Sequence, residues 1–223
     1  MKETVQSTLS SSSLKSMAER VNAIDWGRVS NDLDAQGNAV VECLLSPQEC
    51  ETLAMLYSRD EIFRSRIMMS RHGFGRGEYQ YFRYPLPSLI GQLRFALYPH
   101  LVPMANRWNS AMGIDVSYPA THEKFLTRCH QAGQDKPTPL LLKYDADDYN
   151  CLHQDLYGTH VFPLQAAILL SEPHKDFTGG EFVMTEQRPR MQSRPMVVPL
   201  RQGDGVFLQC IIVRCAGHVA GIG

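Results

Sequence analysis

The 223-residue sequence lacks several features that would place it in a functional class directly. No stretch approaches the ~20 consecutive apolar residues that cross a bilayer, so no membrane partner is expected. The formal net charge is -1, so no global electrostatic field indicates nucleic acid as a partner. The start of the chain has no apolar core of the signal-peptide kind, and the expected location is therefore the cytoplasm.

The six cysteines are scattered and form none of the close Cys-x-x-Cys pairs that hold structural zinc. A chain of this length buries a sizeable core without disulfides, so we expect reduced thiols. We predict that residues 1–20, which are rich in serine, form a disordered tail. Residues 21–223 are then expected to form a single domain.

The first half of this domain carries strong helix signals. After a predicted strand over 37–45, Ser46 is followed by proline at the first helical position and by Glu49 at the third, which predicts a helix over 47–59. We expect helical support over about 47–133.

Two further helices are expected within this range. Apolar residues at every third or fourth position predict a helix over 88–112, with a kink or a division at Pro99 and Pro103. A shorter helix is expected over 120–132. His122 and His130 lie on it, where solvated histidines are commoner than ligands.

After residue 136 the sequence changes to short strand-like runs separated by Asp, Gly and Pro. Several short strands without intervening helices predict an antiparallel jelly-roll core over about 136–206. The predicted fold class is therefore α+β, a jelly-roll core backed by N-terminal helices. The expected strands are 139–145, 149–155, 162–170, 180–185, 195–200 and 205–213.

His153 and Asp155 are the principal candidates for a functional site. On an extended strand, side chains two positions apart point to the same face at a spacing of about 7 Å. An imidazole and a carboxylate on one face supply two of the three ligands of a two-His-one-carboxylate Fe(II) site. Short histidine-acid pairs also arise by chance, so the surrounding sequence has to decide.

That surrounding sequence resembles the iron(II)/2-oxoglutarate-dependent oxygenases, specifically a prolyl-hydroxylase-like bacterial family. The resemblance rests on a Lys-Tyr strand before the pair and on the stretches Phe162–Leu170 and Phe177–Thr185 after it. It implies a double-stranded β-helix, oxygenase activity, Fe(II) and 2-oxoglutarate. The implied partners are dioxygen and an organic or protein substrate that the sequence does not identify.

The resemblance also implies roles for individual residues. It assigns His153 and Asp155 to the metal, and it places Tyr144 where relatives often have a tyrosine near the distal carboxylate of 2-oxoglutarate. Tyr144 fits equally well as an aromatic core residue of its strand. No catalytic residue beyond the metal ligands is predicted.

The resemblance breaks near Phe207. Relatives continue there with roughly Ala-Val-His-His-Arg-Pro-Val, which holds a further histidine and an arginine for the co-substrate. One set of permitted codons for Leu208–Gly217, read two bases later, encodes Ala-Val-His-His-Arg-Pro-Val-Arg-Gly. We therefore hypothesise that 208–223 is a frameshifted tail, and we expect this truncated chain to be impaired as an enzyme.

Two other functions remain open on the sequence alone. One is a non-catalytic jelly-roll binding module, in which His153 and Asp155 are ordinary polar residues. The other is a zinc hydrolase, in which His160 joins them as a ligand. His218 is an in-frame candidate for the third iron ligand, but its glycine-flanked position favours disorder.

Overall fold

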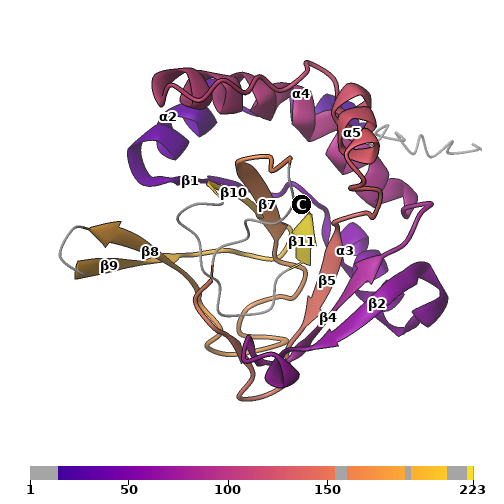
Figure 1. Cartoon of the computed structure of the whole chain (residues 1–223). Helices are drawn as coiled ribbons and strands as arrows, with labels where there is room; N and C mark the ends of the chain where they lie inside the picture. Colours follow the sequence, from indigo (N-terminus) through magenta and orange to yellow (C-terminus); the bar gives the residue numbers. More distant parts are fainter. Residues whose placement is uncertain (1–14, 154–159, 189–191, 210–219, 223) are drawn as a thin grey trace, which may run out of the picture.

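The structure is a computed structural model that describes residues 15–153, 160–188, 192–209 and 220–222. It combines helices with antiparallel sheets, and the helices α2 (Trp26–Gln36), α4 (Ser88–Ala111) and α5 (His122–Gln131) lie along one side of the strands (Figure 1). The α+β jelly-roll class predicted from the sequence is confirmed. No helix in the described part of the chain is long and apolar enough to cross a membrane.

The largest sheet joins segments from opposite ends of the chain. Its strand order is β1-β10-β7-β11, and all its pairings are antiparallel. β1 (Asn38–Val41) pairs with β10 (Gly205–Gln209), which pairs in turn with β7 (Leu164–Ile168). β11 (Ala220–Ile222) pairs with the other edge of β7.

A second sheet lies partly in the range predicted as helical support, which corrects that prediction. It has the order β2-β4-β5, formed by β2 (Phe63–Met68), β4 (Glu78–Phe82) and β5 (Leu140–Lys143). Burial alternates along β4, where every second residue is buried. This two-residue period favours a strand, although the stretch lies between two helical regions.

Two further pairs of strands complete the β structure. β3 (Gly75–Arg76) pairs with β6 (Tyr149–Asn150), so the strand predicted over 149–155 is much shorter in the structure. β8 (Phe182–Arg188) and β9 (Gln192–Val198) form a hairpin that projects from the body of the molecule (Figure 1).

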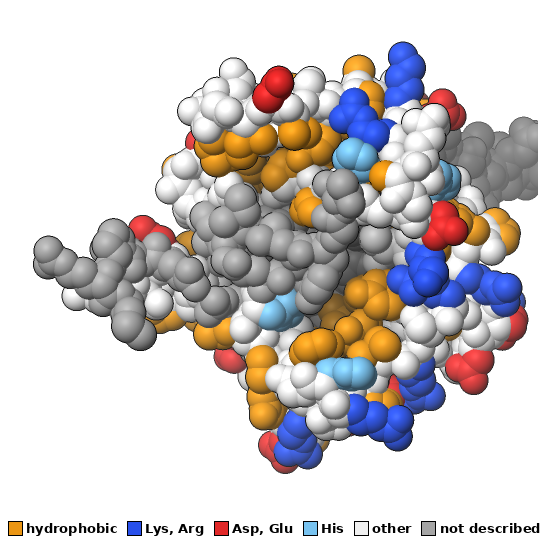
Figure 2. All heavy atoms as spheres, in the orientation of Figure 1, with side chains coloured by type: hydrophobic (Ala, Val, Ile, Leu, Met, Phe, Trp, Pro, Cys, Tyr) orange, Lys and Arg blue, Asp and Glu red, His pale blue; other side chains and the backbone are white. Residues whose placement is uncertain are grey.

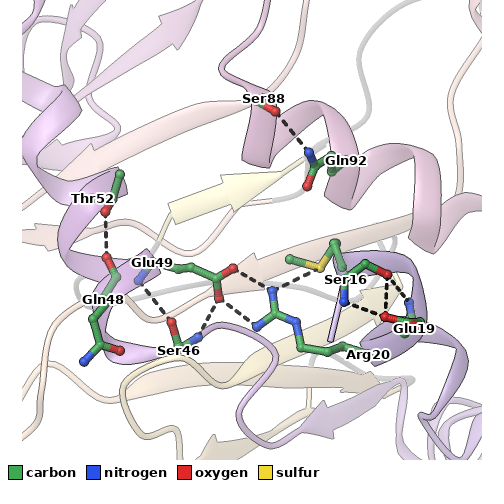
Figure 3. A network of polar contacts seen from close by, with 10 residues as sticks. Ser16, Glu19, Arg20, Ser46, Gln48, Glu49, Thr52, Ser88 and Gln92 are labelled. Atoms are coloured by element: carbon green, nitrogen blue, oxygen red, sulfur yellow. Dashed lines mark hydrogen bonds and ion pairs between the residues drawn. The ribbon is translucent and has the colours of Figure 1, made fainter. Parts of the chain in front are cut away.

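The helices α1 (Met17–Asn22) and α3 (Pro47–Met55) begin with capping boxes and are joined by an ion pair (Figure 3). The box predicted at Ser46 is present, with Glu49 as its partner. A similar box starts α1, so the last residues of the predicted 1–20 tail are helical, and Met17 among them is buried. The first 14 residues lie outside the described part. The short 3-10 helices are Leu56–Ser58, Asp60–Ile62 and Met69–Arg71.

The remaining helices are α2 (Trp26–Gln36), α4 (Ser88–Ala111) and α5 (His122–Gln131). α4 is one helix that contains Pro99 and Pro103, so of the two expected alternatives, a kink or a division, the division is excluded. Both prolines lie on the exposed side, where water can reach the carbonyl groups that lose a backbone donor.

The central sheet is buried on both faces. Phe207 and Ile168 belong to the main core beneath the helices, and Phe207 lies 5.7 Å from Trp26 between ring centroids. Val206 and Leu208 belong to a second cluster shared with the hairpin. Four cysteines are free thiols, as expected, while Cys210 and Cys215 lie outside the described residues.

Candidate active site

A cavity of about 1010 Å³ lies between the helices and the two larger sheets. Its walls include Tyr79 and Tyr81 from β4, Leu142 from β5 and Gln165 from β7. On the face of the molecule that Figure 2 shows, hydrophobic side chains gather in the upper and lower halves, with Lys and Arg side chains toward the right. The cavity has the apolar lining and the few polar groups of a site for an organic ligand.

His153 lines this cavity. Its Nδ1 lies 2.8 Å from the carbonyl oxygen of Cys151. Because a carbonyl oxygen only accepts, Nδ1 donates the proton, and in the neutral imidazole the lone pair then lies on Nε2. A hydrogen bond of this kind fixes the orientation of metal-ligating histidines, so His153 fits a metal centre.

The second predicted ligand, Asp155, falls in 154–159, outside the described residues. His153 itself lies beyond the short strand β6, so the alternation that we expect to align the two side chains does not apply to it. Among the residues that the structure describes, no three His, Cys, Asp or Glu side chains form a metal-binding group. Asp155 is not one of those residues, so the predicted pair stays a prediction.

Tyr144 directly follows β5 and is 4% exposed. It does not line the cavity, although Leu140 and Leu142 on the same strand do. Its ring lies close to Gly77, where a Cβ atom would come within 2.8 Å of the ring. The structure thus places Tyr144 behind the cavity wall, and its role in binding a co-substrate stays a prediction.

His160, the candidate ligand of the zinc alternative, also lines the cavity. Its backbone nitrogen donates to the Oε1 atom of Gln134 at 2.7 Å, and the Nε2 atom of Gln134 donates to its carbonyl oxygen at 3.3 Å. This pair of hydrogen bonds ties the strand side of the cavity to the end of α5. The other candidate, His218, lies outside the described residues.

Helices α4 and α5 supply a wall that the sequence did not predict. Arg94 and His122 line the cavity there. Burial, and then the charge of Arg94, lower the pKa of His122 to about 4, so its imidazole is neutral near pH 7. The expectation of a solvated His122 is therefore wrong, whereas His130 is exposed as expected.

An aromatic cluster closes this end of the cavity. Tyr98, Phe125 and Phe162 line it, with ring centroids 5.2–5.8 Å apart. The Tyr118 ring packs against Phe162 at 5.1 Å, and its hydroxyl donates to the Val161 carbonyl at 2.6 Å. These contacts give the cavity a rigid and largely apolar end.

Comparison with known families identifies the class of the protein. Residues 77–218 match the model of a family described as an oxygenase that catalyses oxidative methylation of damaged DNA. This range covers more than half of the chain and includes the strands that line the cavity. The chain belongs to this oxygenase family, and the oxygenase class that the sequence resemblance implies is confirmed.

Particular relatives come from Mycobacterium tuberculosis. The chain is 50% identical over 121 residues to the uncharacterized protein Rv2227 of strain H37Rv, and equally to a protein of strain CDC 1551. The matched part is 54% of this chain and 52% of the relative, so the chain spans about half the length of the curated relatives it matches.

Two solved structures of prolyl hydroxylases are also similar. A prolyl-4-hydroxylase of Pseudomonas putida is 14% identical, with a TM-score of 0.48 over 88% of this chain and 94% of that chain. A prolyl hydroxylase of Trichoplax adhaerens, solved with a peptide fragment, is 9% identical, with a TM-score of 0.49 over 91% and 87%.

Proposed function

We propose that the protein is an Fe(II)- and 2-oxoglutarate-dependent dioxygenase of the hydroxylase type, acting on a substrate bound in the large cavity. The observation that carries the proposal is the hydrogen bond from His153 Nδ1 to the Cys151 carbonyl, which gives Nε2 the lone pair of a metal-ligating histidine at the cavity wall. Membership in an oxygenase family supports this function over a binding module or a zinc hydrolase.

In this proposal His153 and Asp155 hold the metal, and iron with 2-oxoglutarate supplies the oxidation of a substrate C–H bond, coupled to decarboxylation. The protein's own residues orient the ligands and the substrate. The Cys151 carbonyl holds the imidazole in one tautomer. The aromatic cluster of Tyr98, Phe125 and Phe162 excludes water from one end of the cavity.

We assign Tyr144 to the co-substrate side of the site. It directly follows β5, the strand whose Leu140 and Leu142 line the cavity, which supports a position next to that wall. In this assignment the buried Tyr144 hydroxyl is the group that meets the co-substrate carboxylate. Tyr144→Phe is expected to weaken 2-oxoglutarate binding and to leave Fe(II) affinity unchanged.

The proposed activity is expected to be impaired in the chain as written. The third ligand and the co-substrate arginine that the resemblance implies belong to the shifted reading frame of 208–223. Two protein ligands hold a metal less tightly than three, and an arginine fork matches a carboxylate in two hydrogen bonds. Sequencing the gene across codons 206–209 tests the frameshift directly.

The metal site is tested by titrating Fe(II) into the protein with 2-oxoglutarate under nitrogen and recording the visible charge-transfer band of the chelate. We expect a band that His153→Ala abolishes. His72→Ala is the matched control, because His72 is exposed and does not line the cavity. A band of equal strength in His153→Ala would overturn the assignment.

A chain with the shifted frame restored after Phe207 tests the impairment. The restored chain is expected to bind Fe(II) at least tenfold more tightly and to show faster uncoupled 2-oxoglutarate turnover. Equal affinity in the two chains would mean that this chain completes its site in frame. The substrate is then sought by turnover across a panel of peptides, small acids and, because of the family description, damaged oligonucleotides.

A further inference from the structure

Arg94 lies on the face of α4 that forms the cavity wall. Leu97, Tyr98 and Leu101 follow it at three, four and seven positions, so the four side chains share one helical face. All four line the cavity, and Arg94 is only partly exposed. Its guanidinium group is therefore presented to the space in which a substrate binds.

The charge of Arg94 has no anionic partner among the described residues. The Tyr84 hydroxyl hydrogen bonds to it, and the neighbouring His122 imidazole and Cys129 thiol are neutral near pH 7. Burial lowers the pKa of Arg94, because desolvation makes the charged guanidinium less favourable in the folded chain. A buried charge of this kind normally has a partner.

Other arginines of the chain illustrate the difference. Arg20, Arg66 and Arg107 each have a carboxylate oxygen within 2.7 Å. Among the described residues, the rest of the cavity lining does not supply one for Arg94, since its charged side chains are Arg64 and Lys136 against the exposed Asp135. The described part of the lining thus carries an excess of positive charge beside an apolar, aromatic surface.

We infer that Arg94 is the anion-binding residue of the substrate site, and that the substrate joins an apolar or aromatic body to a carboxylate or phosphate group. The planar guanidinium binds either group through two hydrogen bonds. Tyr98 and Phe125 pack against the apolar body of the substrate. The anionic group of the substrate fixes its orientation in the cavity. The inference rests on the proposed function in taking this cavity as the substrate site.

Binding is measured on the full metal-free chain by calorimetric titration with two aromatic anions, phenyl phosphate and benzoate, with neutral benzamide, and with 2-oxoglutarate for comparison. We expect at least one of the two anions to bind tenfold or more tightly than benzamide. Arg94→Gln is expected to lower the affinity for that anion at least tenfold, and Arg94→Lys to lower it less, because lysine keeps the charge and loses the fork. The preference between the two anions distinguishes a carboxylate substrate from a phosphate substrate.

Arg83→Gln is the matched control, because Arg83 is exposed and does not line the cavity. Thermal unfolding shows whether each variant is folded, and Arg94→Gln is expected to be at least as stable as the unchanged chain, since it removes a desolvated charge. A role of Arg94 in structure alone would give the opposite result.

Three results would overturn the inference. The first is equal affinity of the unchanged chain for the aromatic anions and for benzamide. The second is equal affinity of Arg94→Gln and Arg83→Gln for these anions. The third is a loss of affinity in Arg94→Gln that affects 2-oxoglutarate but neither aromatic anion. None of these titrations contains iron. A failure of the proposed metal site, which appears in the His153→Ala experiment, is therefore separate from a failure of the anion site.

Discussion

Among single residues, His122 links the cavity wall to pH. Its pKa lies at about 4 in the folded chain, against 6.5 for an ordinary histidine. Between these values the unfolded chain binds a proton that the folded chain does not, so the free energy of unfolding falls as the pH is lowered from about 6.5 toward 4. We expect a loss on the order of 1–3 kcal/mol, to which His100 adds in the same direction.

The His122 effect is measured by denaturant unfolding at pH 7, 6 and 5. His122→Gln is expected to flatten the dependence over this range, while His130→Gln, on the same helix but exposed, leaves it unchanged. Parallel pH curves for the two variants would contradict the assignment of His122 as a partly buried neutral imidazole.

Gly203 occupies a position that no other residue fits. Its φ is +84°, and an added Cβ atom would lie 2.1 Å from the carbonyl oxygen of Leu45. Gly113 has a similar φ of +67° but open space around it. Gly203→Ala is therefore expected to cost roughly 3 kcal/mol or more in unfolding free energy, and Gly113→Ala roughly 1 kcal/mol. Chemical denaturation of both variants compares them, and equal losses would show that φ alone matters.

At the scale of elements, the ion pair between Arg20 and Glu49 holds α1 against α3. Arg20 donates to both carboxylate oxygens, at 2.6 and 2.8 Å, and about a quarter of each side chain is exposed. Arg20→Met keeps the packing of the stem and is expected to cost about 1 kcal/mol. The exposed pair of Arg59 and Glu61 gives the control Arg59→Met, with an expected change below about 0.5 kcal/mol. Similar changes in both would rule out a special role for the partly buried pair.

The sequence predicted an element well where all the residues that form its signal lie close together in the chain. The capping box at Ser46 fixed the start of α3, because its hydrogen bonds join residues three positions apart. The strands β2 and β4 were missed. They pair with each other across a short connection, but the third strand of their sheet, β5, pairs with β4 from about 60 residues further along the chain, and the intervening helices dominate the pattern. Pairing over such distances leaves little trace in the sequence near either strand.

The functional residues also divide into those that a local sequence motif predicts and those that depend on long-range packing. The prediction of His153 as a site residue rested on a local motif, and the structure places it at the cavity wall. Arg94 and His122 belong to helices that look like simple support, and only the packing of α4 and α5 beside the sheets turns them toward the cavity. A cationic residue within an apolar helical stripe, as at Arg94, is the one sequence signal that indicates such a role.

For the whole molecule, the pairing of β1 with β10 means that β1 can form its strand pairing only late in synthesis. Val41 pairs with Gly205, so β1 leaves the ribosome long before its partner exists. At translation rates of ~5–20 residues per second, the apolar strand waits on the order of 10–30 s without a neighbour. Ribosome-bound chains stopped before residue 205 are therefore expected to be cut by protease near β1 and to bind chaperones there, whereas chains extended well past residue 209 are protected. Equal protection in both would show that the first half of the protein folds without its last strands.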